Sequence, residues 1–113
     1  KEGWVDFVSS PGPAQPDRTD PDSLGYGGSF WLLDRFDGIP SDTYAGIGNR
    51  GQYMVIVPSH GLVIVRRGFD TDDGGRFDIV AFTRDVIAGI DQGQTDMLDA
   101  QMQASQAEAE YND

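Results

Sequence analysis

Two apolar runs of strand length, joined by a short turn, constrain most strongly what this chain can fold into. They extend over Gln52–Val57 and residues 62–67, and Pro58-Ser59-His60-Gly61 separates them. This pattern predicts a β-hairpin. Apolar residues occupy successive positions in both runs, so each strand is apolar on both faces. Such strands are typical of a sheet that is covered on each side.

The segments before the hairpin extend the predicted sheet. A glycine-rich loop, residues 44–51, leads into the first run. Earlier in the chain, a glycine hinge at Gly27-Gly28 precedes Ser29-Phe30-Trp31-Leu32-Leu33, which fits a buried strand. Residues 34–42 are predicted to form a loop. Three strands in close succession favour an antiparallel meander.

A helical pattern follows the hairpin. Apolar residues within residues 77–90 are spaced by 3, 4 and 4 positions, at Ile79, Phe82, Val86 and Ile90. They form one stripe of an amphipathic helix, which we expect to lie on one face of the sheet and to end at Gly93. The predicted fold class is therefore α+β, an antiparallel meander with a C-terminal amphipathic helix packed on one face.

The regions outside the sheet and helix are predicted to be less regular. The group Trp4-Val5-Asp6-Phe7-Val8 fits the end of a helix that Pro11-Gly12-Pro13 stops. Residues 9–25 are rich in proline and aspartate, and they are predicted to be an irregular connection within a segment that spans residues 1–93. Residues 94–113 form a polar tail, either a frayed helix or disordered. Three apolar residues of this tail either dock on a partner or belong to the frayed end: Met97, Leu98 and Met102.

Composition excludes several classes of function. The formal charge of −11, from 19 acidic and 8 basic residues, argues against a nucleic-acid or anionic-membrane partner, because a phosphate surface would be repelled. The absence of cysteine excludes disulfides and cysteine-ligated zinc. No apolar run reaches the length of about 18 residues that marks a membrane span, and no signal peptide is expected. We expect neither a metal nor a cofactor.

Four segments, taken in order, resemble one family of hydrolases. They are Glu2-Gly3-Trp4-Val5-Asp6-Phe7-Val8, Gly25-Tyr26-Gly27-Gly28-Ser29-Phe30-Trp31-Leu32, Gly48-Asn49-Arg50-Gly51-Gln52-Tyr53 with the strand to Pro58, and Leu62-Val63-Ile64-Val65-Arg66-Arg67-Gly68. Their order and spacing, over roughly residues 2–90, are similar to the C-terminal part of the β-lactamase-related serine hydrolases. This family includes class C β-lactamases, DD-peptidases, family VIII carboxylesterases and 6-aminohexanoate-dimer hydrolases.

The resemblance implies a place for these segments in a larger fold. They would be late strands of a β-lactamase-like antiparallel sheet, with the C-terminal helix packed across it. In the family a long N-terminal half precedes the tryptophan segment, so this chain resembles the last third of a hydrolase. The implied partner is that N-terminal part, as a separate or cleaved chain, and the implied substrate is a small ester or amide.

The mechanism that the resemblance implies needs residues that this chain lacks. A serine is acylated, a lysine three residues later takes its proton, and a tyrosine helps to move that proton. Lys1 is the only lysine, so the chain has no Ser-x-x-Lys motif, and it has no Tyr-x-Asn motif either. The nucleophile, the lysine and the tyrosine would therefore come from another polypeptide.

The chain resembles one wall of the family's catalytic cleft. There a strand that carries Lys-Thr-Gly, or a variant of it, donates a backbone N–H that completes the oxyanion hole. The matching residues 44–50 contain no lysine and no Thr-Gly pair, which favours ester or amide hydrolysis over β-lactam recognition. The resemblance places the oxyanion N–H at Asn49, with these substrate-binding neighbours: Ile47, Gly48, Arg50 and Gln52. Alternatively, the glycines of this segment only permit a tight turn or bulge.

Other polar residues favour structural interpretations. His60 is expected to be a solvated turn residue, because nothing in the sequence brings a serine and an oxyanion hole to it. The acidic run Asp70-Thr71-Asp72-Asp73 misses the spacing of an EF-hand and fits a polar turn that caps a helix. One of Arg66 and Arg67 is expected to extend along the apolar surface or to pair with an acid in the following loop. Three aromatic residues are expected to be core rather than an acyl pocket: Tyr26, Phe30 and Trp31.

Three interpretations of function stay open at this point. In the first, the chain is the C-terminal portion of a serine hydrolase of esterase or amidase type, active only when joined with the missing N-terminal part. In the second, it is a non-catalytic binding or assembly module that retains the sheet and hides its apolar face in a dimer. In the third, it is a free-standing small domain whose resemblance is incidental.

Overall fold

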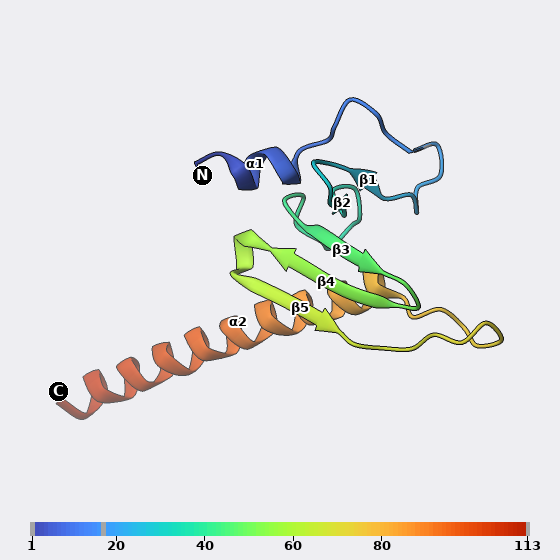
Figure 1. Ribbon diagram of the computed structural model, residues 1–113. Helices are drawn as coiled ribbons and strands as arrows, with labels where there is room; N and C mark the ends of the chain where they lie inside the picture. The colour runs from blue at the N-terminus through green and yellow to red at the C-terminus, as the bar shows by residue number, and fades with distance from the viewer. Residues whose placement is uncertain (1, 17, 113) are drawn as a thin grey trace.

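The computed structural model describes residues 2–16 and 18–112, and these form an α+β fold around one antiparallel sheet (Figure 1). The strands are β1 (Gly25–Tyr26), β2 (Trp31–Leu32), β3 (Tyr44–Gly48), β4 (Gln52–Val57) and β5 (Leu62–Arg66), and they lie in chain order across the sheet. The helices are α1 (Trp4–Ser9), the 3₁₀ helix η1 (Pro58–His60) and α2 (Ile79–Asn112). The predicted meander is confirmed. Lys1, Asp17 and Asp113, which fall within the predicted segments, lie outside the described residues.

The central hairpin forms as predicted. β4 and β5 pair from Tyr53 with Arg66 to Val57 with Leu62. Between them, Gly61 closes η1 in the left-handed region, with φ of 57°, and its N–H donates to the carbonyl of Pro58 at 3.0 Å. A glycine suits this position because it adopts positive φ without a steric penalty. β5 ends at Arg66, one residue earlier than the sequence predicted.

The glycine-rich segment before the hairpin differs from its prediction as a loop. Tyr44–Gly48 is the strand β3, and each of its residues pairs with a residue of β4. Glycine weakens a strand, but the neighbouring β4 supplies a complete set of backbone partners, so tertiary pairing outweighs the local preference. The predicted strand at residues 29–33 is shorter than expected, because only Trp31–Leu32 pairs, and Gly25–Tyr26 adds a further short strand beside it.

The first part of α2 covers one face of the sheet over the middle of its strands. The cross-strand row formed by Ala45, Val55 and Ile64 is 2%, 0% and 8% exposed. Ile79 and Ile87 of α2 pack in the same apolar cluster. Burying this cluster is the main source of stability that the structure offers, since the hydrophobic effect scales with the apolar area removed from water.

The second face is covered only at one end. Here Val8 of α1 packs with Leu32 and Tyr44 in a smaller buried cluster, which confirms a helix at this apolar segment. Toward β5 the cover ends, and three side chains of this face are largely exposed: Met54 (41%), Val63 (58%) and Val65 (65%). The prediction that both faces of the hairpin are covered is therefore wrong within the described residues.

The irregular connection between α1 and β1 is anchored by polar contacts. A part-buried ion pair joins Arg18 to Asp34 at 2.7 Å. The side-chain amide of Gln15 donates to the carbonyl of Tyr26 at 2.7 Å, and its oxygen accepts the N–H of the same residue at 3.0 Å. These contacts tie a proline-rich segment without regular structure to the edge of the sheet.

Helix α2 begins close to where the sequence predicts, but it continues much further. Asp78 caps its first turn, because its carboxylate accepts the N–H of Ala81 at 3.0 Å. The buried stripe includes Thr83 and Ile87, whereas Phe82 is 43% exposed, so the stripe is rotated from the predicted one. The helix passes through Gly93 and reaches Asn112, and the predicted end at Gly93 is wrong. A single glycine costs a helix only about 1 kcal/mol, and the alanine, glutamine and methionine residues that follow favour helix.

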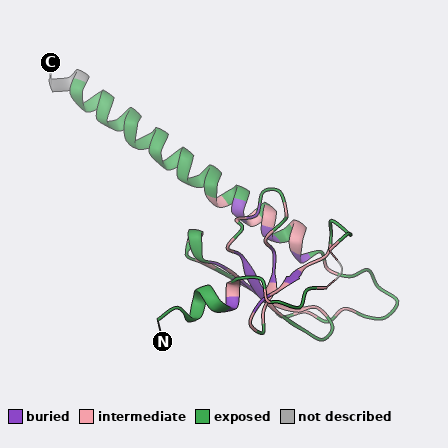
Figure 2. Ribbon diagram, turned by 90° about the horizontal axis from the view of Figure 1, so that it is seen from above, coloured by how far each residue is buried: buried purple, intermediate pink, exposed green. Residues whose placement is uncertain are grey.

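The far part of α2 projects away from the body of the molecule. Figures 1 and 2 show it extending past β5 and η1, and residues 91–109 are all exposed. In the described part of the chain, no helix combines the length and the apolar character needed to span a bilayer.

Candidate functional site

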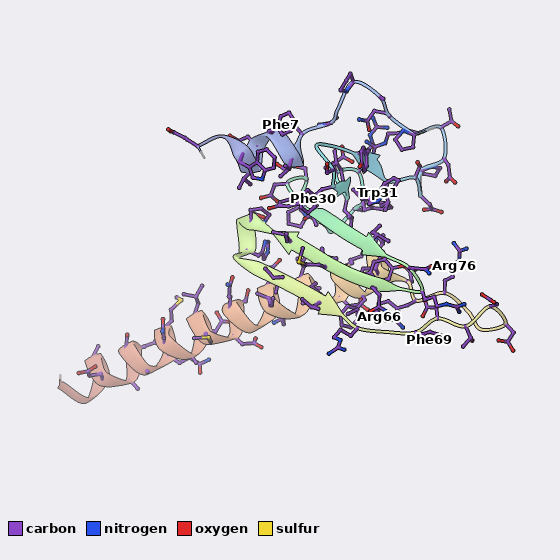
Figure 3. The ribbon with its side chains drawn as sticks, viewed as in Figure 1. Phe7, Phe30, Trp31, Arg66, Phe69 and Arg76 are labelled. Atoms are coloured by element: carbon purple, nitrogen blue, oxygen red, sulfur yellow. The ribbon has the colours of Figure 1, made fainter. Side chains whose placement is uncertain are left out.

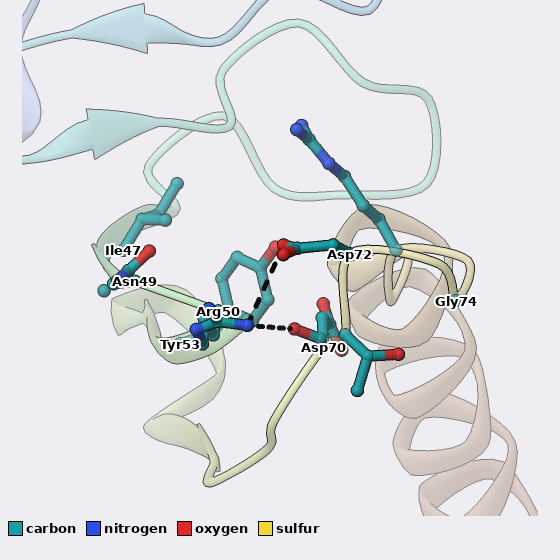
Figure 4. A pocket seen from close by; sticks show the side chains of 11 residues that line it. Ile47, Asn49, Arg50, Tyr53, Asp70, Asp72 and Gly74 are labelled. Atoms are coloured by element: carbon teal, nitrogen blue, oxygen red, sulfur yellow. Dashed lines mark hydrogen bonds and ion pairs between the residues drawn. The ribbon is translucent and has the colours of Figure 1, made fainter.

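A pocket of about 390 Å³ lies beside the turn that joins β3 to β4. One wall is this turn and the other is the loop between β5 and α2 (Figure 4). The lining residues are Ile47, Gly48, Asn49, Arg50, Gly51, Tyr53, Asp70, Thr71, Asp72, Gly74 and Arg76. Four of the five residues that the sequence analysis singled out therefore meet here, and Gln52 does not line this pocket.

The turn has a backbone that few residues other than glycine tolerate. Arg50 and Gly51 are both in the left-handed region, with φ of 61° and 81°. A Cβ on Gly51 would collide with the guanidinium of Arg66 and with the carboxylate of Asp70. The glycine is therefore required by both its φ and its neighbours. Positive φ at Arg50 is uncommon for a residue with a side chain, and surrounding contacts must hold it.

Arg66 provides much of that support. From the end of β5 its guanidinium donates to the carbonyl of Gly51 at 2.7 Å and pairs with Asp70 at 3.0 Å. It also lies over the ring of Phe77, 4.2 Å from the ring centre. Figure 3 shows Arg66 at the junction of the strand and the loop that carries Phe69 and Arg76. The prediction that an arginine at this strand end pairs with an acid in the following loop is confirmed.

Asp70 joins the loop to the turn from the other side. Its backbone N–H donates to the carbonyl of Arg50 at 2.9 Å, and its carboxylate accepts the N–H of Phe77 at 3.2 Å. The Phe77 N–H, followed by the hydrogen bond and charge of Arg66, lowers the pKa of Asp70 despite an opposing effect of burial. The carboxylate is therefore ionised and fixed at the floor of the turn.

Gln52 locks the same turn rather than facing the pocket. Its side-chain amide donates to the carbonyl of Gly68, and its oxygen accepts the N–H of Gly68 at 3.3 Å. Both ends of the amide are thus used on the backbone of one residue. The position predicted as substrate-binding is a brace between β4 and the second residue after β5.

Asn49 occupies the exposed tip of the turn. The neighbouring Arg50 is held by its side chain as well, because its guanidinium lies 4.9 Å from the ring centre of Phe69 and 3.8 Å from the carboxylate of Asp72. The turn is therefore braced from three directions, by the contacts of Arg66, Gln52 and Asp70. A backbone amide in such a turn is preorganised, which is what an oxyanion hole needs.

The pocket beside Asn49 offers polar groups that could bind a small molecule and polarise a bond in it. Its lining residues do not include a nucleophile paired with a base. Among its lining residues there is no serine, lysine, histidine or cysteine, and the hydroxyl groups are those of Tyr53 and Thr71. The charges are balanced in number between Arg50 and Arg76 on one side and Asp70 and Asp72 on the other. Asp70 is paired with Arg66, and Asp72 lies 3.8 Å from Arg50.

A second cluster of polar residues was not expected from the sequence. Ser59 Oγ lies 3.3 Å from His60 Nδ1, and His60 Nε2 lies 3.0 Å from Asp91 of α2. However, the hydroxyl of Ser59 is also 3.1 Å from Asp42, whose carboxylate accepts the N–H of Ser59 at 2.9 Å. The backbone amide that could stabilise an oxyanion is therefore occupied, and neither Ser59 nor His60 lines the pocket beside Asn49. This cluster ties η1 to α2, so His60 is a bridging residue and not only a solvated one.

The three aromatic residues that the sequence predicts to be core are only half-buried, and two of them, Tyr26 and Trp31, line a separate pocket of about 350 Å³. Phe30 packs against Tyr44, with ring centres 5.2 Å apart, in the cluster beneath α1. Tyr26 and Trp31 pair edge to face at 5.0 Å, away from the lining of the Asn49 pocket. Within residues 2–16 and 18–112, no group of three or more histidine or acidic residues is arranged to hold a metal ion.

Compared with known proteins, the chain matches no family model, no curated protein and no solved structure. The evidence on function is therefore the pocket beside Asn49 and the partly exposed sheet next to it.

Proposed function

We propose that this chain is the C-terminal portion of a serine hydrolase that acts on ester or amide bonds through an acyl-enzyme. In this proposal the strand β3 and its turn line the cleft, and the backbone N–H of Asn49 is the second oxyanion donor. The serine, its lysine and the tyrosine come from the N-terminal part of the hydrolase, on a separate or cleaved chain. The surrounding architecture would be that of the β-lactamase-like fold.

The observation that carries the proposal is the braced, solvent-accessible turn at Asn49 beside a pocket. Gly48, Asn49 and Arg50 line about 390 Å³ of open space. Contacts from three side chains or backbones hold the turn, those of Arg66, Asp70 and Gln52. A binding surface needs no such rigidity in an exposed tip, whereas stabilising a developing oxyanion depends on donors that do not reorganise.

A non-catalytic assembly module is the second candidate, and a different observation favours it. The exposed apolar side chains Met54, Val63 and Val65 would suit a protein partner without any chemistry at the Asn49 pocket. The two candidates differ in one measurable property. Only the first requires a reactive serine in the assembled protein.

Two experiments test the hydrolase. The chain, purified with its native partners, is analysed by intact mass and labelled with a fluorophosphonate probe. We expect a companion polypeptide that contains Ser-x-x-Lys and takes the label. A lone 12.3 kDa species without a labelled companion would refute the two-part hydrolase.

Substitution at the oxyanion position tests the role of Asn49 in the assembled complex, without the probe, because a fluorophosphonate blocks the serine. Asn49→Pro removes the backbone N–H, and we expect kcat to fall about 10²-fold to 10³-fold, as for the loss of one oxyanion donor. Asn49→Ala keeps the N–H and is the matched control, for which we expect nearly unchanged kcat. Circular dichroism checks that both variants are folded. Equal activity of the two variants would remove Asn49 from the oxyanion hole.

A further inference from the structure

The pocket of about 350 Å³ at the β1 end of the sheet shares no lining residue with the pocket beside Asn49. Two of its lining residues are aromatic, Tyr26 of β1 and Trp31 of β2. The others belong to the connection between α1 and β1, and they are Ala14, Gln15 and Pro16. None of these five lining residues carries a charge. The proposed function gives this pocket no role.

The two aromatic rings of this pocket stand outside the apolar core. Tyr26 is the cross-strand partner of Trp31, and Trp31 is that of Ala45 in β3, so the three side chains share one face of the sheet. Ala45 is buried in the cluster beneath α2, whereas both aromatic residues are half-buried and belong to neither apolar cluster. The rings meet edge to face, with centres 5.0 Å apart and planes inclined by 68° (Figure 3 labels Trp31). They therefore keep aromatic surface that a ligand can contact.

Hydrogen bonds hold the connection beside these rings. The side-chain amide of Gln15 donates to the carbonyls of Gly12 and Tyr26, each at 2.7 Å, and its oxygen accepts the N–H of Tyr26 at 3.0 Å. The N–H of Gly12 donates to the same Tyr26 carbonyl at 2.9 Å. Both walls of the pocket are thus joined through the backbone of Tyr26. A pocket whose walls are already held together loses less conformational entropy when a ligand binds.

The chemistry of the lining favours a positively charged organic group. An aromatic ring carries negative charge density on its faces, and tryptophan attracts a cation most strongly. The formal charge of −11 also favours cations and opposes anionic ligands. Arg18 of the connection does not offset this, because it is paired with Asp34 at 2.7 Å. Since Gln15 already uses both amide hydrogens, a cation without N–H groups loses nothing here, and a quaternary ammonium group is such a cation.

We propose that this pocket binds a small soluble molecule that carries a quaternary ammonium group, placed between the rings of Tyr26 and Trp31 and the ring of Pro16. The methyl groups of the ligand contact the rings, and its charge is attracted by the electron density of the aromatic faces. This inference does not rest on the proposed hydrolase, because the two pockets have no residue in common.

The exposed aromatic pair of α1 fits such a ligand less well. Trp4 and Phe7 line a pocket of about 270 Å³ together with Glu2 and Gly3, and their ring planes are inclined by only 32°. All four lining residues lie within residues 2–7, so no second segment of the described chain faces the rings. This pair is therefore a matched control for the pocket of Tyr26 and Trp31.

A titration of the full chain with choline tests the site. The chain has two tryptophans, so Trp4→Phe leaves Trp31 as the only one, and its fluorescence reports on the pocket. We expect a saturable change with choline. The neutral compound 3,3-dimethylbutan-1-ol has nearly the same shape without the charge, and we expect it to bind at least about fivefold more weakly. Equal binding of the two compounds, or no saturable change with choline, would overturn the proposal.

Substitutions locate the binding, which is followed by the NMR signal of the choline methyl protons. Trp31→Leu and Tyr26→Leu should each weaken choline binding at least about fivefold, whereas Trp4→Leu should leave it unchanged. Trp31→Phe keeps a ring in β2 and should retain part of the binding. Circular dichroism checks that each variant is folded. Unchanged binding in both leucine variants of the pocket, or loss of binding in Trp4→Leu instead, would contradict the assignment.

Vesicles distinguish a soluble ligand from a lipid headgroup with the same chemistry. The full chain is sedimented with vesicles of phosphatidylcholine, whose headgroup carries a quaternary ammonium group. We expect the chain to stay in the supernatant while choline still binds. Sedimentation with the vesicles that Trp31→Leu abolishes would overturn the assignment to a soluble molecule and replace it with a lipid headgroup.

Discussion

The two faces of the sheet carry similar residues at β5 but have opposite surroundings. On the face packed against α2, the row Ala45, Val55 and Ile64 stays buried to the last strand. On the other face, the row Leu32, Tyr44, Ile56 and Val63 begins at 0% exposure at Leu32 and ends at 58% at Val63. The difference shows that apolar sequence alone does not decide burial. What decides it is which neighbouring element reaches that part of the sheet.

The largest predicted difference in stability is between alanine substitutions at two adjacent residues of β5. Ile64→Ala leaves a cavity between the sheet and α2 and should lower the free energy of unfolding by about 2–4 kcal/mol. Val65→Ala, on the open face, should change it by less than about 0.5 kcal/mol. Urea unfolding of both variants measures this difference. If the two substitutions lowered the free energy of unfolding equally, Val65 would have to be buried in solution, which would contradict an open second face.

A smaller effect should arise where α1 covers one end of the second face. A Cβ at position 27 would collide with the carbonyl of Val8 and lie 2.8 Å from that of Ser10. Gly27→Ala should therefore displace the end of α1 and cost about 1–3 kcal/mol. Gly12→Ala is the control, since its Cβ would meet its nearest atom at 3.5 Å. Thermal unfolding compares the two, and a neutral Gly27→Ala would show that α1 does not dock as described.

The smallest predicted effect on stability comes from the contacts of Asp70 with Arg66 and Phe77, just after β5. The pKa of Asp70 lies below its ordinary value of 3.8, so its contribution to stability is complete above that pH and is lost as pH falls through the lowered pKa. An NMR titration of the Phe77 amide should report this loss below about pH 4. Asp70→Asn should abolish the titration step. A step that persists in the variant would assign it to another carboxylate.

Much of the architecture could be predicted from local pattern. The continuous apolar run in Gln52–Val57, the turn at Pro58 and the periodicity after Ile79 predict the hairpin, the meander and the C-terminal helix. The sequence predicts a loop where β3 forms, because its glycines weaken the local strand signal, although its partner β4 decides the outcome. It also predicts a helix end at Gly93, because a single glycine signals a break and the helix-forming residues on both sides outweigh it.

The candidate site could be predicted only in part. Ile47, Gly48, Asn49 and Arg50 were placed together because they are close in sequence. The sequence does not predict that Arg66 and Asp70 brace this turn, since their hydrogen bonds to Gly51 and Arg50 join segments 15 and 20 positions apart. The bridge from His60 to Asp91 was missed for the same reason, because it spans 31 positions.

By itself, the sequence determined the central hairpin, the start of the C-terminal helix and which residues are apolar, because these follow from side-chain chemistry and its period along the chain. Only the tertiary structure decided which apolar residues are buried, since burial depends on where distant elements lie relative to one another. That is why Ile64 and Val65, adjacent and alike, differ so much: one faces α2, and the other faces a side of the sheet that this chain leaves open.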